Sequence, residues 1–471
     1  MTIPVRNPRT GLEDYVLRPL SEDELLKQTQ RLRMGQVEWN NKGINHRIAA
    51  LKVWQEQIVA AKEEIIEALT VDTGRYAESV LEFNLLPTTI TRWIGWAGAF
   101  FNQENEKQSQ VPMIRIRQDN VPYSLVSVIS PWNFPLLLSI IDTIPALLAG
   151  SAVIVKPSEI TPRFIKVLQE TIDLTPHLRD VLFYTEGARH TGSLLVAAGD
   201  ITCFTGSVAT GKRVYQQAAS LFKPCFLELG GKDAAIVIEG ANTDHAARSI
   251  LWGSTVNCGH SCLSVERVYV QRDIYTEFLQ KIKNEADQIQ LAIEDPRKGQ
   301  IGPVISLQQV NIINDHLKDA IAKGAKIISG NAACQLIHGG YYCRPTILTD
   351  VNHDMKVMTE ETFGPIIPIM PFDTVDEGIA MVNDSIFGLS GAVFAATNEA
   401  AVKIASKIDA GAISINECAL TAIVHDGEKN SFKYSGMGGS RMGPSSLQRF
   451  LRKKAYLINE NIGPSAWWFH G

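Results

Sequence analysis

The chain has 471 residues, of which 45% are hydrophobic and 20% charged, with a formal net charge of −5. A single hydrophobic core stops growing at roughly 250–300 residues, so we expect two or three domains. The slight acidic excess argues against nucleic acid as a partner, and seven cysteines are too sparse for a disulfide framework.

The N-terminus has no apolar core of signal-peptide length, so we expect a cytoplasmic protein. The apolar stretch of residues 135–155 could be mistaken for a membrane span. Asp142, Pro145 and Gly150 interrupt it, and a buried helix followed by a buried strand explains it better. We therefore expect no transmembrane segment.

In chain order, residues 47–69 repeat apolar groups at helical spacing, which predicts an amphipathic helix on a core. The polar residues 105–123 predict a hairpin arm. From residue 124, short apolar runs alternate with helical patterns. We predict strands at 124–130, 152–156, 181–184, 201–204 and 225–229, and helices at 136–148, after Pro162, at 190–198 and at 208–220.

This alternation indicates a parallel, doubly wound α/β sheet, which binds ligands at the carboxyl ends of its strands. The same pattern resumes after Asp233 and runs to about residue 416, which predicts a second α/β domain.

Residues 204–212, FTGSVATGK, nearly match the phosphate loop GxxxxGK[ST], but Arg213 stands where the final Ser or Thr should be. We interpret the segment as a pyrophosphate site at a helix N-terminus that Ser207 caps. A capped turn without a ligand is the alternative.

Glu228, in LELGGK, ends a buried strand and is a candidate general base, since burial raises the pKa of a carboxyl group. A structural, salt-bridged glutamate is the alternative. Cys262, in NCGHSCLS, follows Cys258 and His260, a spacing that suggests zinc. No second ligand pair follows, which argues against a zinc site. Cys262 is therefore either a nucleophilic thiol or an inert buried one.

Two more loops carry polar groups after strands. Asn133, in SPWNFP, could donate to a developing oxyanion or cap a helix. Lys156 and Glu159, in KPSE, could bind ribose hydroxyls or form a solvated pair.

The order of SPWNFP, KPSE, FTGS, LELGGK, GHSC, EETFGP and NxxxFGLS resembles the aldehyde dehydrogenase superfamily, from about Ile48 to about Lys454. The resemblance implies that Cys262 attacks the aldehyde. Asn133 and the Cys262 backbone N–H would form the oxyanion hole, and Glu228 would activate water to hydrolyse the thioester.

The resemblance also implies an NAD site. Its expected residues are Ile129, Trp132, Lys156, Ser158, Glu159, Gly187, Gly206, Ser207, Leu229, Gly230, Glu361 and Phe363. Lys156 and Glu159 should bind the adenosine ribose, and Glu361 and Phe363 the nicotinamide side. We favour NAD over NADP, because the Glu159 carboxylate would repel a 2′-phosphate. No metal is expected, and Asn416 should lie near the site.

For the domains, the resemblance implies a Rossmann-type NAD-binding domain at 1–108 and 124–230 and a catalytic domain at 231–430. Residues 109–123 and 431–471 would be oligomerisation or bridging elements of a homodimer or homotetramer. The aromatic tail at Trp467, Trp468 and Phe469 would dock on a partner subunit or stay without a fixed structure.

Three segments depart from the family pattern. His260 stands where the family usually has Gln, and either tunes the thiol or only packs. The glycine-rich PFGG is replaced at residues 430–432, before Lys433. Gly187 stands alone, without the second glycine of a GxG turn.

Concerning the substrate, resemblance to bacterial enzymes for long-chain, aromatic or apocarotenoid aldehydes favours a hydrophobic aldehyde. The helical cluster of Trp93, Trp96, Phe100 and Phe101 would line an apolar tunnel, or simply pack. The alternatives are a small polar semialdehyde, transfer of the acyl group to coenzyme A, a phosphate-loop NTPase and a catalytically inactive protein on this fold.

Overall fold

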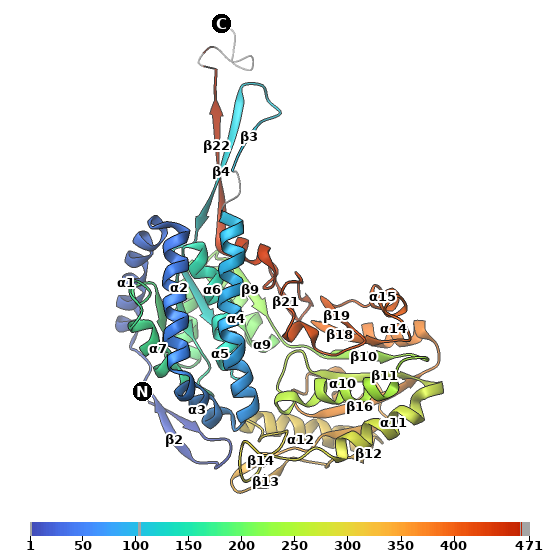
Figure 1. Cartoon of the computed structure of the whole chain (residues 1–471). Helices are drawn as coiled ribbons and strands as arrows, with labels where there is room; N and C mark the ends of the chain where they lie inside the picture. Colours follow the sequence, from blue (N-terminus) through green and yellow to red (C-terminus); the bar gives the residue numbers. More distant parts are fainter. Residues whose placement is uncertain (1, 102–104, 462, 464–471) are drawn as a thin grey trace.

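The structure is a computed structural model and describes residues 2–101, 105–461 and 463. Two sheets with their helices lie side by side, and a narrow β-arm projects from one end of the molecule (Figure 1). The expected α/β fold is confirmed. The aromatic tail, Trp467 to Phe469, lies outside the described residues.

The first sheet has six strands in the order β21-β9-β8-β5-β6-β7. Five are parallel and lie at or within one residue of their predicted bounds: β5 (Leu125–Ile129), β6 (Ala152–Lys156), β7 (Leu182–Tyr184), β8 (Ile201–Thr205) and β9 (Cys225–Glu228). The connecting helices α7 (Phe164–Asp173), α8 (Arg189–Ala198) and α9 (Val208–Ser220) also follow the prediction. Strand β21 (Gly436–Met437) adds antiparallel to β9.

The strand order reverses at β5, because the chain runs outward through β6 and β7 and returns to the other side of β5 for β8 and β9. In such folds, ligands bind in the crevice outside the carboxyl ends of the strands, at this reversal. The loops after β5, β6, β8 and β9 therefore meet at the expected place for a site.

Two helix predictions were wrong in the same way. Each helix that was predicted as continuous is a pair of shorter helices in the structure. Residues 47–69 fall into α2 (Gly43–Ala60) and α3 (Lys62–Thr73), and residues 136–148 into α5 (Pro135–Ile140) and α6 (Thr143–Ala149). At Ala61, a change of direction lets the apolar stripes of both helices enter one core. At the second break, Asp142 turns its carboxylate to Arg441 and Arg449.

The remaining N-terminal elements surround the first sheet. They are β1 (Ile3–Arg6), β2 (Glu13–Leu17), α1 (Glu22–Asn41) and α4 (Tyr76–Phe101). Buried side chains of α1 and α4 join the core beneath the sheet, so these helices form part of the first unit.

The second sheet has seven strands in the order β12-β15-β16-β11-β10-β18-β19. All neighbours are parallel except β12 and β15. The strands are β10 (Asp233–Val237), β11 (Val265–Gln271), β12 (Lys326–Ser329), β15 (Thr346–Thr349), β16 (Ile366–Phe372), β18 (Ser390–Phe394) and β19 (Ala412–Ile415). The second α/β alternation, predicted from Asp233 to about residue 416, is confirmed.

Helices cover both faces of this second sheet, so its central strands are buried. The helices are α10 (Thr243–Thr255), α11 (Arg272–Asp287), α12 (Leu307–Ala322), α13 (Lys356–Thr359), α14 (Val375–Asn383) and α15 (Asn398–Ala405). Two short ladders lie outside it: β13 (Gln335–Ile337) with β14 (Gly340–Tyr342), and β17 (Phe387–Gly388) with β20 (Phe432–Lys433).

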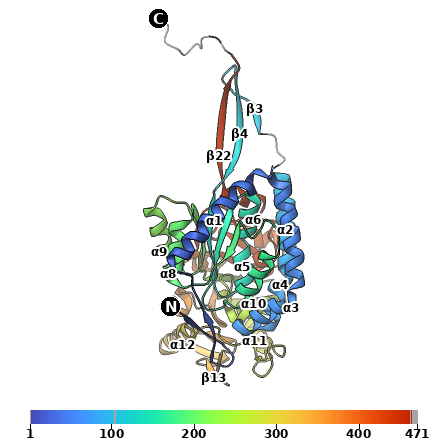
Figure 2. The same cartoon turned by 90° about the vertical axis from the view of Figure 1, so that its left-hand side faces the viewer.

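The arm is a three-stranded antiparallel sheet in the order β22-β4-β3 (Figures 1 and 2). The predicted hairpin is β3 (Glu106–Gln108) with β4 (Ile114–Pro122), and β22 (Leu451–Asn459) pairs with the whole of β4. The hairpin therefore crosses the domain boundary placed at residue 108, and β21 joins the first sheet from the C-terminal segment. The assignment of functions to these domains stays a prediction.

Within the described part of the chain, no helix combines the length and the apolar character needed to cross a membrane. The apolar stretch at 135–155 is a pair of short helices followed by β6, all buried in the first unit.

Candidate active site

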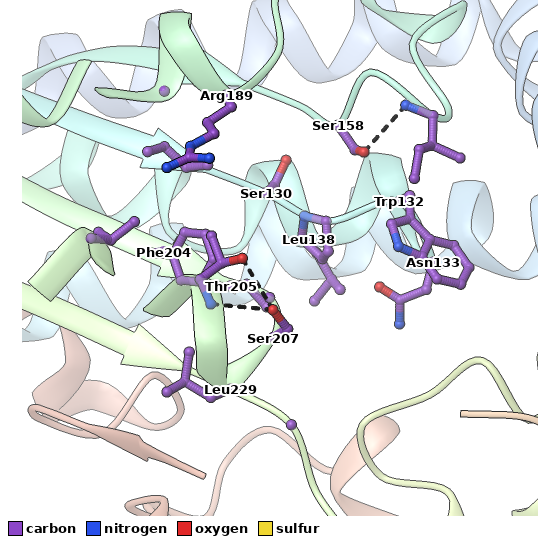
Figure 3. Close-up of a pocket in the computed structure, with 18 of the residues that line it drawn as sticks. Ser130, Trp132, Asn133, Leu138, Ser158, Arg189, Phe204, Thr205, Ser207 and Leu229 are labelled. Atoms are coloured by element: carbon purple, nitrogen blue, oxygen red, sulfur yellow. Dashed lines mark hydrogen bonds between the residues drawn. The ribbon is translucent and has the colours of Figure 1, made fainter. Parts of the chain in front are cut away.

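A cavity of about 550 Å³ lies along the carboxyl ends of β5, β6, β8 and β9. Loops from the first sheet form one wall, and the start of α12 and the loop at residues 361–363 close it from the second unit. Trp132 and Asn133 lie at one end of the view in Figure 3, and Arg189 and Phe204 at the other. The volume is within the usual range for a cofactor or small-molecule site.

Asn133 is fixed in the loop between β5 and α5. Its backbone carbonyl accepts from Arg75 Nη2 (3.0 Å) and from Asn257 Nδ2 (2.9 Å). Its side-chain Nδ2 donates to the carbonyl of His260 (3.0 Å), which uses one of the two amide hydrogens. Because Asn133 also lines the cavity, its carboxamide is held beside the Cys262 loop as an oxyanion donor requires.

Cys262 reaches the cavity from a tightly bent loop after α10. Asn257 and Cys258 have left-handed φ angles of 60° and 56°, conformations that non-glycine residues rarely adopt. Asn257 holds the bend, since its Nδ2 also donates to the His260 carbonyl (2.9 Å) and its N–H to Glu78 (3.1 Å). Strained backbone of this kind gathers at functional sites.

The two cysteines of this loop have different surroundings. Cys258 is buried in the core of the second unit, whereas Cys262 is half-buried and lines the cavity. Loss of solvent raises the pKa of Cys262 to about 12, although the charge of Lys429 opposes the rise. Without a ligand, the sulfur is therefore a protonated thiol at neutral pH.

His260 packs among aromatic rings. Its ring is fully buried, 5.1 Å from the Trp132 ring and 6.0 Å from the Phe363 ring, centroid to centroid. Neither ring nitrogen has a hydrogen-bond partner among the described residues. Burial, assisted by Arg75, lowers the pKa of His260 well below its usual range, so the ring is neutral. Of the two interpretations left open by the sequence, packing is the one the structure supports.

Glu228 ends β9 and lines the cavity with Cys262. Its backbone carbonyl accepts from the Gly206 N–H (3.1 Å), which ties β9 to the loop after β8. Its side-chain Oε2 accepts from the Ser431 hydroxyl (2.8 Å). The carboxylate is half-buried and is not part of a salt bridge among the described residues, which disfavours the structural, salt-bridged interpretation.

Glu361 reaches back from the second unit to the LELGGK segment. Its Oε1 accepts from the Gly231 N–H (2.9 Å). A Cβ at position 230 would lie 2.4 Å from Glu361 Oε2, so a side chain there would displace the Glu361 carboxyl group. Burial, reinforced by the charge of Glu266, raises the pKa of Glu361 to about 8. Its carboxyl group therefore carries a proton for much of the neutral pH range.

A buried ion pair that was not predicted supports Phe363. Glu266 accepts from the Lys232 Nζ (2.7 Å) and from the backbone N–H groups of Thr362 (2.6 Å) and Phe363 (2.7 Å). Phe363 itself has a left-handed φ of 50°. The ion pair holds this loop in an unfavourable backbone conformation. The Phe363 ring lies next to the Trp132 ring, with 5.4 Å between the ring centroids. Lys232 stands in LELGGK, but nothing in the sequence links Glu266 to it.

At the other side of the cavity, Lys156 ends β6 and is buried. Its Nζ donates to Glu159 Oε2 (3.2 Å), Pro157 O (3.0 Å) and Gly187 O (2.9 Å). Burial lowers the pKa of Lys156, and the Glu159 carboxylate opposes this. Ser158 turns its hydroxyl to the Ile160 N–H (3.2 Å) within the same loop (Figure 3).

The loop after β8 is a capped helix start. Ser207 accepts from the Thr210 N–H (3.3 Å) at the N-terminus of α9, and both residues line the cavity. Lys212 instead lies over the Tyr434 ring, 4.2 Å from its centroid, and does not line the cavity. A phosphate-loop lysine must reach the phosphates, so this placement argues against the NTPase interpretation.

Almost all predicted site residues gather around this cavity. Cys262, Glu228, Asn133 and the expected cofactor residues line it, with the exception of Gly187. Gly187 lies behind Lys156 and packs against Thr191, whose Oγ1 would be 2.1 Å from an added Cβ. These groups fit a dinucleotide: a helix N-terminus for the pyrophosphate, and the carboxyl groups of Glu159 and Glu361 at the two ends for the riboses.

Two further sets of residues named from the sequence lie outside the lining of the cavity. Asn416, expected near the site, does not itself line the cavity; its side chain accepts from the Ala395 N–H after β18 and donates to Asn398 Oδ1 at the start of α15. None of the four aromatic residues of α4 lines it either. Trp93 is 3% exposed in the core and meets Trp96 edge to face, so this cluster packs.

Sequence reasoning missed the residues supplied by α12 and α8. Ser306, Gln309 and Ile312 line the cavity from the start of α12, which carries no recognisable motif. Arg189 lines it from the first position of α8. The sequence did carry a sign of Arg189. It stands two residues after Gly187, where the expected GxG turn would have its second glycine.

Comparisons with known proteins agree with this geometry. The model of the aldehyde dehydrogenase family matches residues 1–456. Over 95% of this chain and 84% of the relative, the sequence is 34% identical to a 4,4′-diapolycopene aldehyde oxidase of a Methylomonas species. It is 30% identical, over 90% and 82%, to a protein of Mycobacterium ulcerans provisionally named succinate-semialdehyde dehydrogenase [NADP(+)] 2.

Among solved structures, one provisionally described as the aldehyde dehydrogenase PutA of Anabaena variabilis is 51% identical. It matches with a TM-score of 0.98 over the whole of both chains. A betaine aldehyde dehydrogenase of Staphylococcus aureus, solved with NAD+, is 26% identical, with a TM-score of 0.92 over 100% of this chain and 96% of that one.

Proposed function

Since the chain belongs to the aldehyde dehydrogenase family, we propose that it oxidises an aldehyde to the carboxylic acid through a thioester on Cys262. The observation that carries the proposal is that Cys262, Asn133 and Glu228 line one cavity with the expected cofactor residues. Asn133 and Cys262 come from two separate loops and Glu228 from the end of β9, so their convergence is a property of the fold.

In the first half of the reaction, the Cys262 thiol gives its proton to solvent water and its sulfur attacks the aldehyde carbon. A C–S bond forms, and the carbonyl oxygen becomes an oxyanion. The Asn133 amide and the Cys262 backbone N–H donate to this oxygen, where removing one such donor typically costs about 10²–10³ in rate. When bound, NAD(P)+ would supply the acceptor for the hydride of the resulting tetrahedral carbon, and Glu361 and Phe363 would hold its nicotinamide side. Loss of that hydride converts the carbon into a thioester on Cys262.

In the second half, Glu228 takes a proton from water. The water oxygen bonds to the thioester carbon, the C–S bond breaks and the Cys262 sulfur leaves. The product is the carboxylic acid. The presence of Glu228 in the cavity favours water over coenzyme A as the acyl acceptor, because transfer to a thiol needs no water-activating carboxylate.

Concerning the cofactor, we propose NAD as the preferred partner. The Glu159 carboxylate would accept from a ribose 2′-hydroxyl and repel a 2′-phosphate. Its ion pair with Lys156 (3.2 Å) weakens that repulsion, so we expect measurable activity with NADP. The NAD+ complex of the betaine aldehyde dehydrogenase supports the first expectation, and the NADP in the name of the M. ulcerans relative the second.

For the substrate, we propose a hydrophobic aldehyde. The 34% identity to the diapolycopene aldehyde oxidase over nearly the whole chain supports this class. A small polar semialdehyde is the second candidate, which the 30% identity to the M. ulcerans protein supports. We also propose a cytoplasmic homodimer or homotetramer assembled through the β3-β4-β22 arm.

The test is NADH release over an aldehyde panel graded from short to long chains, with aromatic and carboxylated members. The wild type should turn over long or aromatic aldehydes most efficiently, and Cys262→Ala should release no NADH. Cys258→Ala is the matched control, since this thiol is four residues away but buried outside the cavity. Substantial turnover by Cys262→Ala would refute the nucleophile.

A further inference from the structure

The side chain of Glu228 has one hydrogen-bond partner among the described residues, the hydroxyl of Ser431, 2.8 Å from Oε2. We infer that Ser431 is a positioning residue that holds the Glu228 carboxylate for attack of water on the thioester. This inference rests on the proposed role of Glu228 as the base. It adds a residue that carries no charge and that lies outside the family motifs.

Ser431 is itself firmly placed, which a positioning residue must be. The next two residues form β20 and pair with β17, so the segment is tied to the second unit. Five residues later, Gly436 pairs with Glu228 as β21 joins β9. The segment therefore crosses directly over the base and is anchored on both sides of it.

The close approach depends on Gly436. A Cβ at this position would lie 2.3 Å from the Leu227 carbonyl and 2.9 Å from the Ser431 Cβ. Any side chain there would push Ser431 away from Glu228. Glycine thus allows the 431–436 turn to fold tightly enough for a short serine side chain to reach the carboxylate.

The serine is also a departure from the family pattern. It stands in residues 430–432, the segment that departs from the PFGG expected from the family resemblance. In this chain, the replacement supplies a donor next to the base. One carboxylate oxygen is engaged by Ser431, and the other is left to take the proton of water.

A buried cation, Arg441, lies at the end of the neighbouring strand β8. It is buried, donates to Asp142 Oδ2 (2.6 Å) and to the Thr205 hydroxyl, and so keeps a fixed place beside β8. Burial alone would lower the pKa of Arg441, but Asp142 and, less strongly, Glu228 raise it above its usual value. Glu228 is therefore held by a neutral donor on one segment and lies in the field of a permanent cation on another.

The experiment measures hydrolysis of the acyl-enzyme separately from the oxidation of aldehyde. The enzyme is acylated on Cys262 with p-nitrophenyl acetate, without cofactor, and loss of the acetyl group is followed by rapid quench and mass spectrometry. A hydrogen bond to a charged group predicts that Ser431→Ala slows this step by about 10-fold to 100-fold. The rate of acylation should change less than about 2-fold.

Three comparisons isolate the hydrogen bond. Ser431→Thr keeps the hydroxyl and should hydrolyse within about 3-fold of the wild type. Ser406→Ala removes an exposed serine hydroxyl at the end of α15, outside the cavity, and should have no effect. In a Glu228→Gln background, Ser431→Ala should slow hydrolysis by less than a further factor of about 2, because Ser431 acts on hydrolysis through the Glu228 carboxylate. The acid limb of the pH profile for hydrolysis should move to higher pH in Ser431→Ala.

Equal hydrolysis rates in Ser431→Ala and the wild type would overturn the inference, as would an undiminished effect in the Glu228→Gln background. A loss of acylation and hydrolysis together, with an unmoved pH profile, would also overturn it, because that pattern indicates a structural role. Failure of the proposed function looks different: the wild type would release no NADH with any aldehyde, or Cys262 would not be acylated.

Discussion

Asp142 provides the sharpest test of how the C-terminal segment is attached to the first unit. Its carboxylate is buried between α5 and α6 and accepts from Arg441 (2.6 Å) and Arg449 (2.7 Å). Burial alone would raise the pKa of Asp142, but the two guanidinium groups outweigh it and lower the pKa to about 2. Asp142→Asn keeps the shape of the side chain and removes its charge.

The size of the effect follows from these contacts. Lowering the pKa from 3.8 to about 2 corresponds to about 2 kcal/mol of stability at neutral pH, since one pKa unit is worth about 1.36 kcal/mol. The folded-state pKa is the lower one, so this contribution is present above pH 4 and is lost as the pH falls from about 4 to about 2. Asp142→Asn also strands two buried cations, which brings the expected loss to about 3–5 kcal/mol.

Thermal unfolding at pH 7 measures this loss, with Asp373→Asn as the matched control. Asp373 pairs with Arg272 in the same Asp–Arg chemistry, but more than half of each side chain is exposed. We expect Asp142→Asn to lower Tm by about 3–5 °C and Asp373→Asn by less than about 1 °C. Equal Tm values for the two variants would refute the argument that burial makes the Asp142 pair strong.

Three other predictions concern the site and the arm. Glu159→Ala should lower the ratio of kcat/KM for NAD to that for NADP by about 10-fold or more, because the repulsion of a 2′-phosphate is removed; initial rates that leave the ratio unchanged would contradict it. Burial raises the pKa of Cys262 to about 12, so the rate of its alkylation by iodoacetamide in the free enzyme should rise about tenfold per pH unit between pH 7 and 9. A plateau of this rate within that range would contradict the raised pKa. Leu457→Lys, at a β22 position that is 71% exposed, should shift the oligomer towards monomer in light scattering, and an unchanged mass would exclude Leu457 from the interface.

The strands of the first sheet could be predicted because each is a short, continuous apolar run between turn residues. Parallel strands buried on both faces show this pattern, and β6 and α9 have the predicted bounds. The breaks at Ala61 and within 136–148 could not be read in the same way. Asp142 interrupts an apolar run, but its partners Arg441 and Arg449 are distant in the sequence, and only the folded chain brings them together.

The same contrast between local motifs and distant contacts applies to the site. Asn133, Glu228 and Cys262 stand in recognisable motifs at strand or loop ends, so their place at one cavity was predictable. The supporting contacts were not. Glu266 holds Phe363 from inside β11, and Ser431 holds Glu228 from the segment that departs from the family pattern. A motif identifies the group that reacts, whereas the groups that orient it are chosen by packing.

The C-terminal segment has a consequence for the order of folding. A ribosome releases β4 and β9 long before β21 and β22, which pair with them. Until the last residues emerge, β4 carries an open edge, the kind of surface on which strands of other chains add and aggregate. A chain that stops at residue 430 would keep that edge, lose the partners of Asp142 and leave Glu228 without Ser431. Completion of synthesis therefore both covers the open edge of β4 and brings Ser431 to Glu228.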